Sequence, residues 1–88
     1  MRFEYDEKKS ELNHTKHGIN LENARRLWED PDIIVGPATS VVEERWAAVG
    51  MIGGVHWLAV FTYRADSIRL ITCRRARLEE IETYEASK

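Results

Sequence analysis

The chain has 88 residues, which is enough for one hydrophobic core but too few for two domains, a doubly wound enzyme or a barrel. With 43% hydrophobic and 32% charged residues it is expected to be globular rather than disordered or fibrous, as a single domain over residues 1–88. Thirteen basic and 15 acidic side chains give a formal net charge of −2, which argues against binding nucleic acid over the whole surface.

The N-terminal segment and the cysteine content predict a cytoplasmic protein that does not associate with membranes. Residues 1–9 are charged from the second position onward, and the longest apolar run, residues 57–61, is far shorter than a membrane span. Cys73 has no second cysteine with which to form a disulfide or a CxxC motif, which fits a reducing compartment.

The first 17 residues are predicted to form a strand and a helix. Residues 2–5 alternate polar and aromatic side chains, the pattern of a short strand with one buried face. A mostly solvated helix is expected over residues 7–17, because Asp6 is a good N-cap and Gly18 suits a left-handed helix stop.

A second helix is predicted after Asn20, another N-cap residue, and it is expected to end at Asp30-Pro31 because proline disfavours helical backbone in the residue before it. Apolar residues recur at helical spacing, so the helix has one apolar face, formed by Leu21, Ala24, Leu27 and Trp28.

From residue 33 the hydrophobic period changes to two, which predicts β-strands. Turns are expected at Gly36-Pro37, Gly53-Gly54 and residues 65–67. These turns separate strands over residues 33–35, 42–51, 55–63 and 68–73, and a helix follows from about residue 78. The strand at 55–61 is apolar on both faces and is expected at the centre of the sheet. The predicted fold is α+β in the order β-α-α-β-β-β-β-α, with one mostly antiparallel sheet packed by helices.

Residues 68–75 interleave arginines with apolar side chains at the end of a predicted strand. A guanidinium group held on rigid backbone binds phosphate through two hydrogen bonds, so this pattern is typical of a phosphate site. The same arginines can instead form surface ion pairs with Glu43, Glu79, Glu80 or Glu82. Strict alternation puts Arg69 and Arg75 on one face and Arg74 on the other, but strand ends often depart from it, so the sequence leaves open which arginines converge.

Two other segments carry groups suited to acid or base chemistry. Lys16 and His17 lie at the end of the first predicted helix, and a histidine can act as a general acid or base. His14 and His17 have the spacing of metal ligands, but no third ligand is spaced to join them, so no metal site is predicted. Glu44 precedes Arg45 and can act as a base, orient an arginine or lie on a solvated edge strand.

The aromatic residues and the cysteine are assigned to the core. Trp28, Trp46 and Trp57 sit in apolar patterns, which favours burial over stacking on nucleic-acid bases. Cys73 is expected to be a buried, inert thiol rather than a reactive thiolate.

Several short motifs along the chain occur together in one known family. They are Phe3-Glu4-Tyr5-Asp6, Lys16-His17-Gly18-Ile19, Glu44-Arg45-Trp46 and the arginine-bounded segment 69–74, with Tyr84 in the last helix. With these motifs the sequence resembles, over nearly its whole length, the BrnT family of bacterial type II toxins. The resemblance implies a RelE-like fold and a ribonuclease toxin that arrests growth.

The resemblance also implies site residues, carried over position by position. Thr72 stands where the family usually has serine, and Cys73 where it usually has alanine. Catalytic roles are expected for Arg69, Arg74, His17, Glu44 and Tyr84, and RNA contacts for Lys16, Arg45, Arg64, Arg75 and Arg77.

Cleavage of RNA without a metal or other cofactor needs a base for the 2′-hydroxyl, cations for the charge on the phosphorane, and an acid for the leaving 5′-oxygen. We expect Arg69 and Arg74 to stabilise the charge and His17, ahead of Glu44 and Tyr84, to act as base or acid.

The partner implied by the resemblance is a BrnA-type antitoxin, a ribbon-helix-helix protein through which the toxin contacts DNA only indirectly. A toxin dimer within a toxin–antitoxin heterotetramer is also implied. Two alternatives stay open: a non-catalytic toxin-like module that binds such a partner, since arginines also bind partner carboxylates, and a metal-dependent nuclease.

Overall fold

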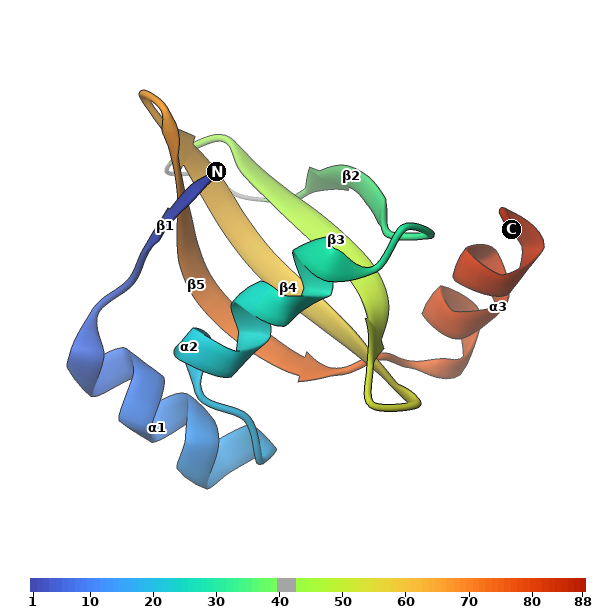
Figure 1. The fold of residues 1–88 in the computed structure, drawn as a ribbon, viewed down its shortest axis with the longest axis horizontal. Helices are drawn as coiled ribbons and strands as arrows, with labels where there is room; N and C mark the ends of the chain where they lie inside the picture. The colour runs from blue at the N-terminus through green and yellow to red at the C-terminus, as the bar shows by residue number, and fades with distance from the viewer. Residues whose placement is uncertain (40–42) are drawn as a thin grey trace.

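The computed structural model describes residues 1–39 and 43–88 and contains a five-stranded sheet with helices on both faces (Figure 1). The elements are, in chain order, β1 (Arg2–Glu4), α1 (Glu7–His17), α2 (Leu21–Ala24), the 3₁₀ helix η1 (Arg25–Glu29), β2 (Ile34–Ala38), β3 (Arg45–Ile52), β4 (Val55–Arg64), β5 (Ser67–Arg75) and α3 (Leu78–Ala86). The predicted α+β class is confirmed. The first residue of the strand predicted over residues 42–51 lies outside the described residues.

The strands are ordered β1-β5-β4-β3-β2 across the sheet. Strand β1 runs parallel to β5, and the other neighbouring pairs are antiparallel, so the sheet is mixed. Strand β4 lies at the centre, as its two apolar faces predicted. The hairpin between β3 and β4 turns at Gly53 and Gly54, whose positive φ angles of 56° and 80° are those that favour glycine.

Local capping chemistry sets the helix ends as predicted. The Asp6 carboxylate accepts a hydrogen bond from the backbone N–H of Lys9 at 3.1 Å, and Gly18 ends α1 in the left-handed conformation. The side chain of Asn20 accepts a hydrogen bond from the N–H of Asn23 at 2.7 Å and begins α2.

The predicted second helix is confirmed over residues 21–29 and ends before Asp30, but only Leu21–Ala24 is α-helical and Arg25–Glu29 continues as the 3₁₀ helix η1. Leu21, Ala24 and Leu27 of its predicted apolar face are fully buried. One local prediction was wrong. Gly36-Pro37 is not a turn but lies within β2. Proline is tolerated there because β2 is an edge strand of the sheet, where one side of the backbone needs no strand partner.

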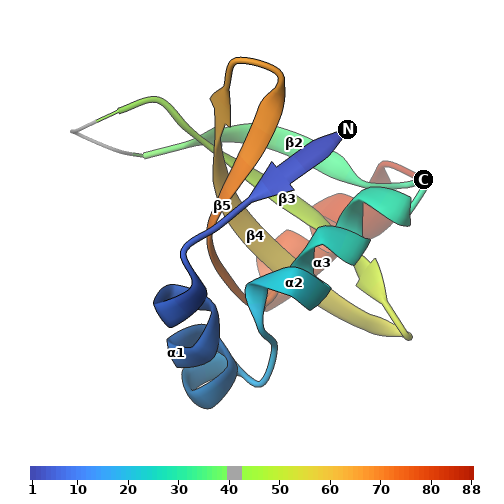
Figure 2. The ribbon, with the colours of Figure 1, turned by 60° about the vertical axis from the view of Figure 1, so that its left-hand side comes forward.

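The sheet divides the core into two parts, and helices pack on each of its faces (Figure 2). On one face α2 and η1 cover the larger cluster, to which β4 and β5 contribute buried residues such as Phe61, Leu70 and Cys73. On the other face α3 packs Tyr84 against Val49 and Leu58. Helix α3 lies against β3 and the neighbouring residue Leu58 of β4 on this face. No helix within the described ranges has the length and apolarity needed to cross a membrane.

Candidate functional site

A bulge in β5 decides which arginines share a face. Val60 of β4 is paired with Thr72, but the next residue, Phe61, is paired with Leu70, so Ile71 is an extra residue in β5. The insertion reverses the alternation of side chains beyond it, which is why Leu70 and Cys73 both enter the larger core cluster.

Arg69 and Arg74 therefore lie on the same face of the sheet. Their partners in β4, Thr62 and Leu58, are four residues apart and project to one side, the side on which α3 lies. Four strand residues separate the two arginine backbones by about 13 Å. Arg75 lies on the opposite face, with its guanidinium carbon 5.7 Å from the ring centroid of Trp57.

Arg74 is held tightly by Glu80 of α3. Its two terminal nitrogens donate to the two carboxylate oxygens of Glu80, both at 2.9 Å, and Nη1 also donates to the backbone oxygen of Arg75. The hydrogen bond from Arg74 lowers the pKa of Glu80, and the same bond raises the pKa of Arg74. Since Glu80 also accepts the N–H of Arg77, this ion pair joins the end of β5 to the first turn of α3.

Arg69 has a looser contact. Its Nη1 lies 3.4 Å from a carboxylate oxygen of Glu4, and one third of its side chain is exposed. A phosphate can replace a contact of this kind at small cost, because a partly exposed ion pair contributes about 1 kcal/mol or less.

Helix α1 lines a small cleft beside the bulge. The cleft has a volume of about 170 Å³ and is lined by Lys9, Leu12, Asn13, Lys16 and His17 of α1 and by Ile71 and Thr72 of β5. Lys16 is exposed and His17 is half-buried. The structure thus brings Lys16 and His17 next to the part of β5 that lies between Arg69 and Arg74.

Asn13 joins α1 to the bulge and was missed as a site residue. Its side chain is buried, and its Nδ2 donates to the backbone oxygens of Ile19 at 2.7 Å and Cys73 at 2.8 Å. Its Oδ1 accepts the N–H of Cys73 at 3.1 Å and the hydroxyl of Thr72 at 3.0 Å. The amide therefore pairs with the backbone of Cys73 as a neighbouring strand would. A polar residue in a helix that was predicted to be mostly solvated carries no sequence signal of this burial.

The structure places Tyr84 away from this cleft. Its side chain is 1% exposed, and its hydroxyl donates to Oδ2 of Asp30 at 2.6 Å. Burial, followed by the hydrogen bond to Asp30, raises the pKa of Tyr84. Tyr84 thus anchors α3 to the segment that follows η1.

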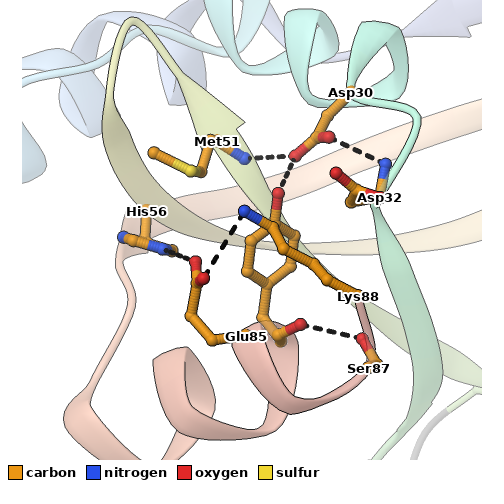
Figure 3. A network of polar contacts seen from close by, with 8 residues as sticks. Asp30, Asp32, Met51, His56, Glu85, Ser87 and Lys88 are labelled. Atoms are coloured by element: carbon orange, nitrogen blue, oxygen red, sulfur yellow. Dashed lines mark hydrogen bonds and ion pairs between the residues drawn. The ribbon is translucent and has the colours of Figure 1, made fainter.

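Figure 3 shows the polar network around this anchor. Asp30 also accepts the backbone N–H of Met51 at 2.8 Å, and the carboxylate of Glu85 lies 2.9 Å from the ring of His56 and 3.4 Å from the ammonium group of Lys88. Burial alone would raise the pKa of Asp30, but hydrogen bonds from Tyr84 and the backbone lower it. These groups connect α3 with β3 and β4.

The other predicted site residues lie at the ends of strands β3 and β4 and at the start of α3. Glu44 is exposed just before β3, and its backbone oxygen accepts the hydroxyl of Thr62 at 2.8 Å. Arg45 begins β3 with its Nε buried and 3.6 Å from Glu43. Arg64 ends β4, and Arg77 is the N-cap of α3; both are exposed.

Cys73 and the tryptophans occupy core positions. Burial raises the pKa of the Cys73 thiol to about 12, so it is a thiol rather than a thiolate. Trp28, Trp46 and Trp57 pack against the larger core cluster. Within residues 1–39 and 43–88, no three or more histidine, cysteine or acidic side chains gather so that they could hold a metal ion.

The sequence matches the model of one protein family. A family model described as "Ribonuclease toxin, BrnT, of type II toxin-antitoxin system" matches residues 5–80. The chain belongs to the BrnT family. The matched range includes α1, the bulge of β5 and both Arg69 and Arg74, whereas Tyr84 lies beyond it. Membership of this family implies a ribonuclease toxin with an antitoxin partner. No curated protein matches the sequence at a significant level.

Proposed function

We propose that this BrnT-family chain is an endoribonuclease toxin that cleaves RNA without a metal cofactor and thereby arrests growth. The observation that supports this most directly is the common face of Arg69 and Arg74, on either side of a cleft that contains Lys16 and His17. Positive charge thus gathers in this region although the protein as a whole has a net charge of −2, and this supports binding of a phosphodiester chain here.

The reaction is a transesterification. A base removes the proton of the 2′-hydroxyl, the 2′-oxygen bonds to phosphorus, and the bond from phosphorus to the 5′-oxygen breaks as an acid protonates that oxygen. The products are a 2′,3′-cyclic phosphate and a 5′-hydroxyl end. Arginine donors that bind the phosphorane more strongly than the phosphate lower the barrier.

His17 is our first choice for proton transfer. It is half-buried at the end of α1, on the cleft that adjoins the bulge. Glu44 is the second choice because it is exposed, while Tyr84 is third because its hydroxyl already donates to Asp30. Arg45 and Arg64 lie on strands whose α3-side face extends this surface, and Arg77 lies at its margin; we propose RNA contacts for them.

The two arginines need not act on the same phosphate. Since their backbones are about 13 Å apart, both side chains must lean inward to reach one phosphate, and otherwise they contact successive phosphates of one strand. A contact to the scissile phosphate lowers kcat when it is removed, whereas a contact to a neighbouring phosphate mainly raises KM.

The test is cleavage of a single-stranded RNA by purified protein in excess EDTA. Arg69→Ala should reduce kcat/KM by about 10²-fold to 10³-fold, the loss expected for a charge-stabilising donor. Arg74→Lys keeps the charge near Glu80 and should reduce the rate less than Arg69→Ala. Arg26→Ala is the matched control, since Arg26 is exposed on η1 at the opposite face. Wild-type rates in Arg69→Ala, or abolition of cleavage by EDTA, would contradict the proposal.

A non-catalytic binding module is the second candidate. It is favoured by the fact that Arg45, Arg69 and Arg74 each contact a glutamate within the chain, which shows that they can bind carboxylates. Expression without a partner distinguishes the two: an active toxin stops growth and Arg69→Ala restores it, whereas a binding module is tolerated in both forms.

We further propose a BrnA-type antitoxin with a ribbon-helix-helix fold as the neutralising partner, and a cytoplasmic location. A RelE-like fold and a heterotetramer containing a toxin dimer belong to the same proposal. Co-expression with such a protein should restore growth, and the mass of the purified complex measures its stoichiometry.

A further inference from the structure

The orientation of the Asn13 amide determines how Thr72 can bond in the cleft. Nδ2 faces two carbonyl oxygens, those of Ile19 and Cys73, and Oδ1 faces the N–H of Cys73, so the amide cannot be turned around. Because Oδ1 only accepts, the Thr72 hydroxyl must use its one proton to donate to it.

Thr72 therefore presents an oxygen that can only accept a further hydrogen bond. Thr72 is half-buried and lines the cleft, which is shallow and open to solvent, so a ligand can approach it there. An acceptor of this kind repels a phosphate oxygen and suits a hydroxyl or an amino group. The basic residues of the same cleft, Lys9 and Lys16, suit a phosphate.

A hydrogen-bond acceptor next to two lysines suits a ligand that has both a hydroxyl and a phosphate, as one sugar-phosphate unit does. The cleft, at about 170 Å³, is smaller than sites that enclose a free small ligand, which begin at roughly 300 Å³. In RNA the 2′-hydroxyl is on the carbon next to the one that bears the 3′-phosphate ester, so a phosphate on the lysines brings that hydroxyl near Thr72.

We infer that this cleft is a ribose-specific subsite, in which Thr72 accepts a hydrogen bond from a ribose 2′-hydroxyl while Lys16 contacts the adjacent phosphate. The inference rests on the proposed function in taking RNA as the ligand, but it assigns a binding role to Thr72 and an orienting role to Asn13. Deoxyribose lacks the donor and leaves the Thr72 oxygen unpaired.

Ribonucleoside 3′-monophosphates and their 2′-deoxy counterparts test this inference, because neither contains a bond that the enzyme can cleave. Binding is followed by NMR titration of the backbone amides of Lys16, Ile71 and Thr72. Wild type and Thr72→Ser, which keeps the hydroxyl, should prefer the ribonucleotide by roughly threefold to tenfold, the contribution of one hydrogen bond. Thr72→Val should bind both equally, with its affinity for the deoxynucleotide unchanged.

The outcomes separate the subsite from the proposed function. An unchanged preference in Thr72→Val, no preference in wild type, or a changed preference among bases instead of sugars would each overturn the subsite. Thr72→Val should keep its fold, because Oδ1 of Asn13 retains the N–H of Cys73, and Thr72→Ala, which also lacks the hydroxyl, provides the answer if it does not. Wild-type protein that selects ribonucleotides but does not cleave RNA refutes the proposed function alone. Cleavage with an unchanged preference in Thr72→Val refutes the subsite alone.

Discussion

Replacing Asn13 by alanine should be among the most destabilising single changes in this protein. The Asn13 amide makes four hydrogen bonds to groups of Ile19, Thr72 and Cys73, and three of those groups are backbone atoms. Each bond contributes about 1 kcal/mol net, and a buried group left without a partner costs more than that. Asn13→Ala should therefore lower the free energy of unfolding by roughly 3–5 kcal/mol, a large part of the roughly 5–15 kcal/mol of a typical domain.

Urea unfolding followed by tryptophan fluorescence measures this loss. Asn23→Ala is the control, because Asn23 is exposed on α2 and its replacement should change the free energy of unfolding by less than about 0.5 kcal/mol. A cost below about 1 kcal/mol for Asn13→Ala would refute the reasoning, since it would mean that the four bonds do not hold α1 against β5.

A carboxyl at the same position adds a pH dependence. Asn13→Asp keeps an acceptor for Cys73 but faces two carbonyl oxygens where the amide donated. Burial and those oxygens should raise the pKa of the new carboxyl above its unfolded value of about 3.9. Its contribution to stability is then full below that pH and is lost as the pH rises through the folded pKa, so this variant should lose stability relative to wild type between pH 4 and pH 7.

Three further predictions test other parts of the structure. Gly50→Ala should cost about 1–3 kcal/mol in urea unfolding, because an added Cβ would lie 2.8 Å from a leucine carbon of η1, whereas Gly36→Ala meets nothing within 4 Å and should cost less. Cys73, whose pKa burial raises to about 12, should react with iodoacetamide at pH 8 far more slowly in native than in unfolded protein; equal rates would contradict its burial. Tyr84→Phe should cost roughly 1.5–3 kcal/mol at pH 7 by removing the bond to ionised Asp30. Because the folded pKa of Asp30 is lowered, its stabilisation is present above about pH 3.9 and is lost below it, so the difference from wild type should narrow by pH 3.

Features that depend on neighbouring residues were predictable from the sequence. Asp6, Gly18 and Gly53 act within a few residues of themselves, through a cap, a left-handed stop and a turn. The Gly36-Pro37 turn failed because the same dipeptide is compatible with an edge strand, and which strand is at the edge depends on distant pairing. The parallel pairing of β1 with β5 also depends on residues more than 60 positions apart.

The types of residue in the candidate site were predictable, but their arrangement was not. Arginines between apolar residues indicated a phosphate site, yet strict alternation separates Arg69 from Arg74. Their common face results from the extra residue Ile71, which is visible only in the pairing of β5 with β4. The approach of α1 to this segment depends on Asn13, whose partners at Thr72 and Cys73 are 59 and 60 residues away.

The net charge of −2 becomes informative once the charges are placed on the structure. Helix α1 is sorted by side: Lys9, Lys16 and His17 line the cleft beside β5, whereas Glu7 and Glu11 line a separate hollow toward α2. A helix that is mixed in sequence thus presents cations to one surface and carboxylates to another. Because acidic surfaces repel phosphates, the RNA that we propose as substrate should be attracted where the cations gather and repelled elsewhere, so this small acidic protein should bind it at one site without retaining nucleic acid generally.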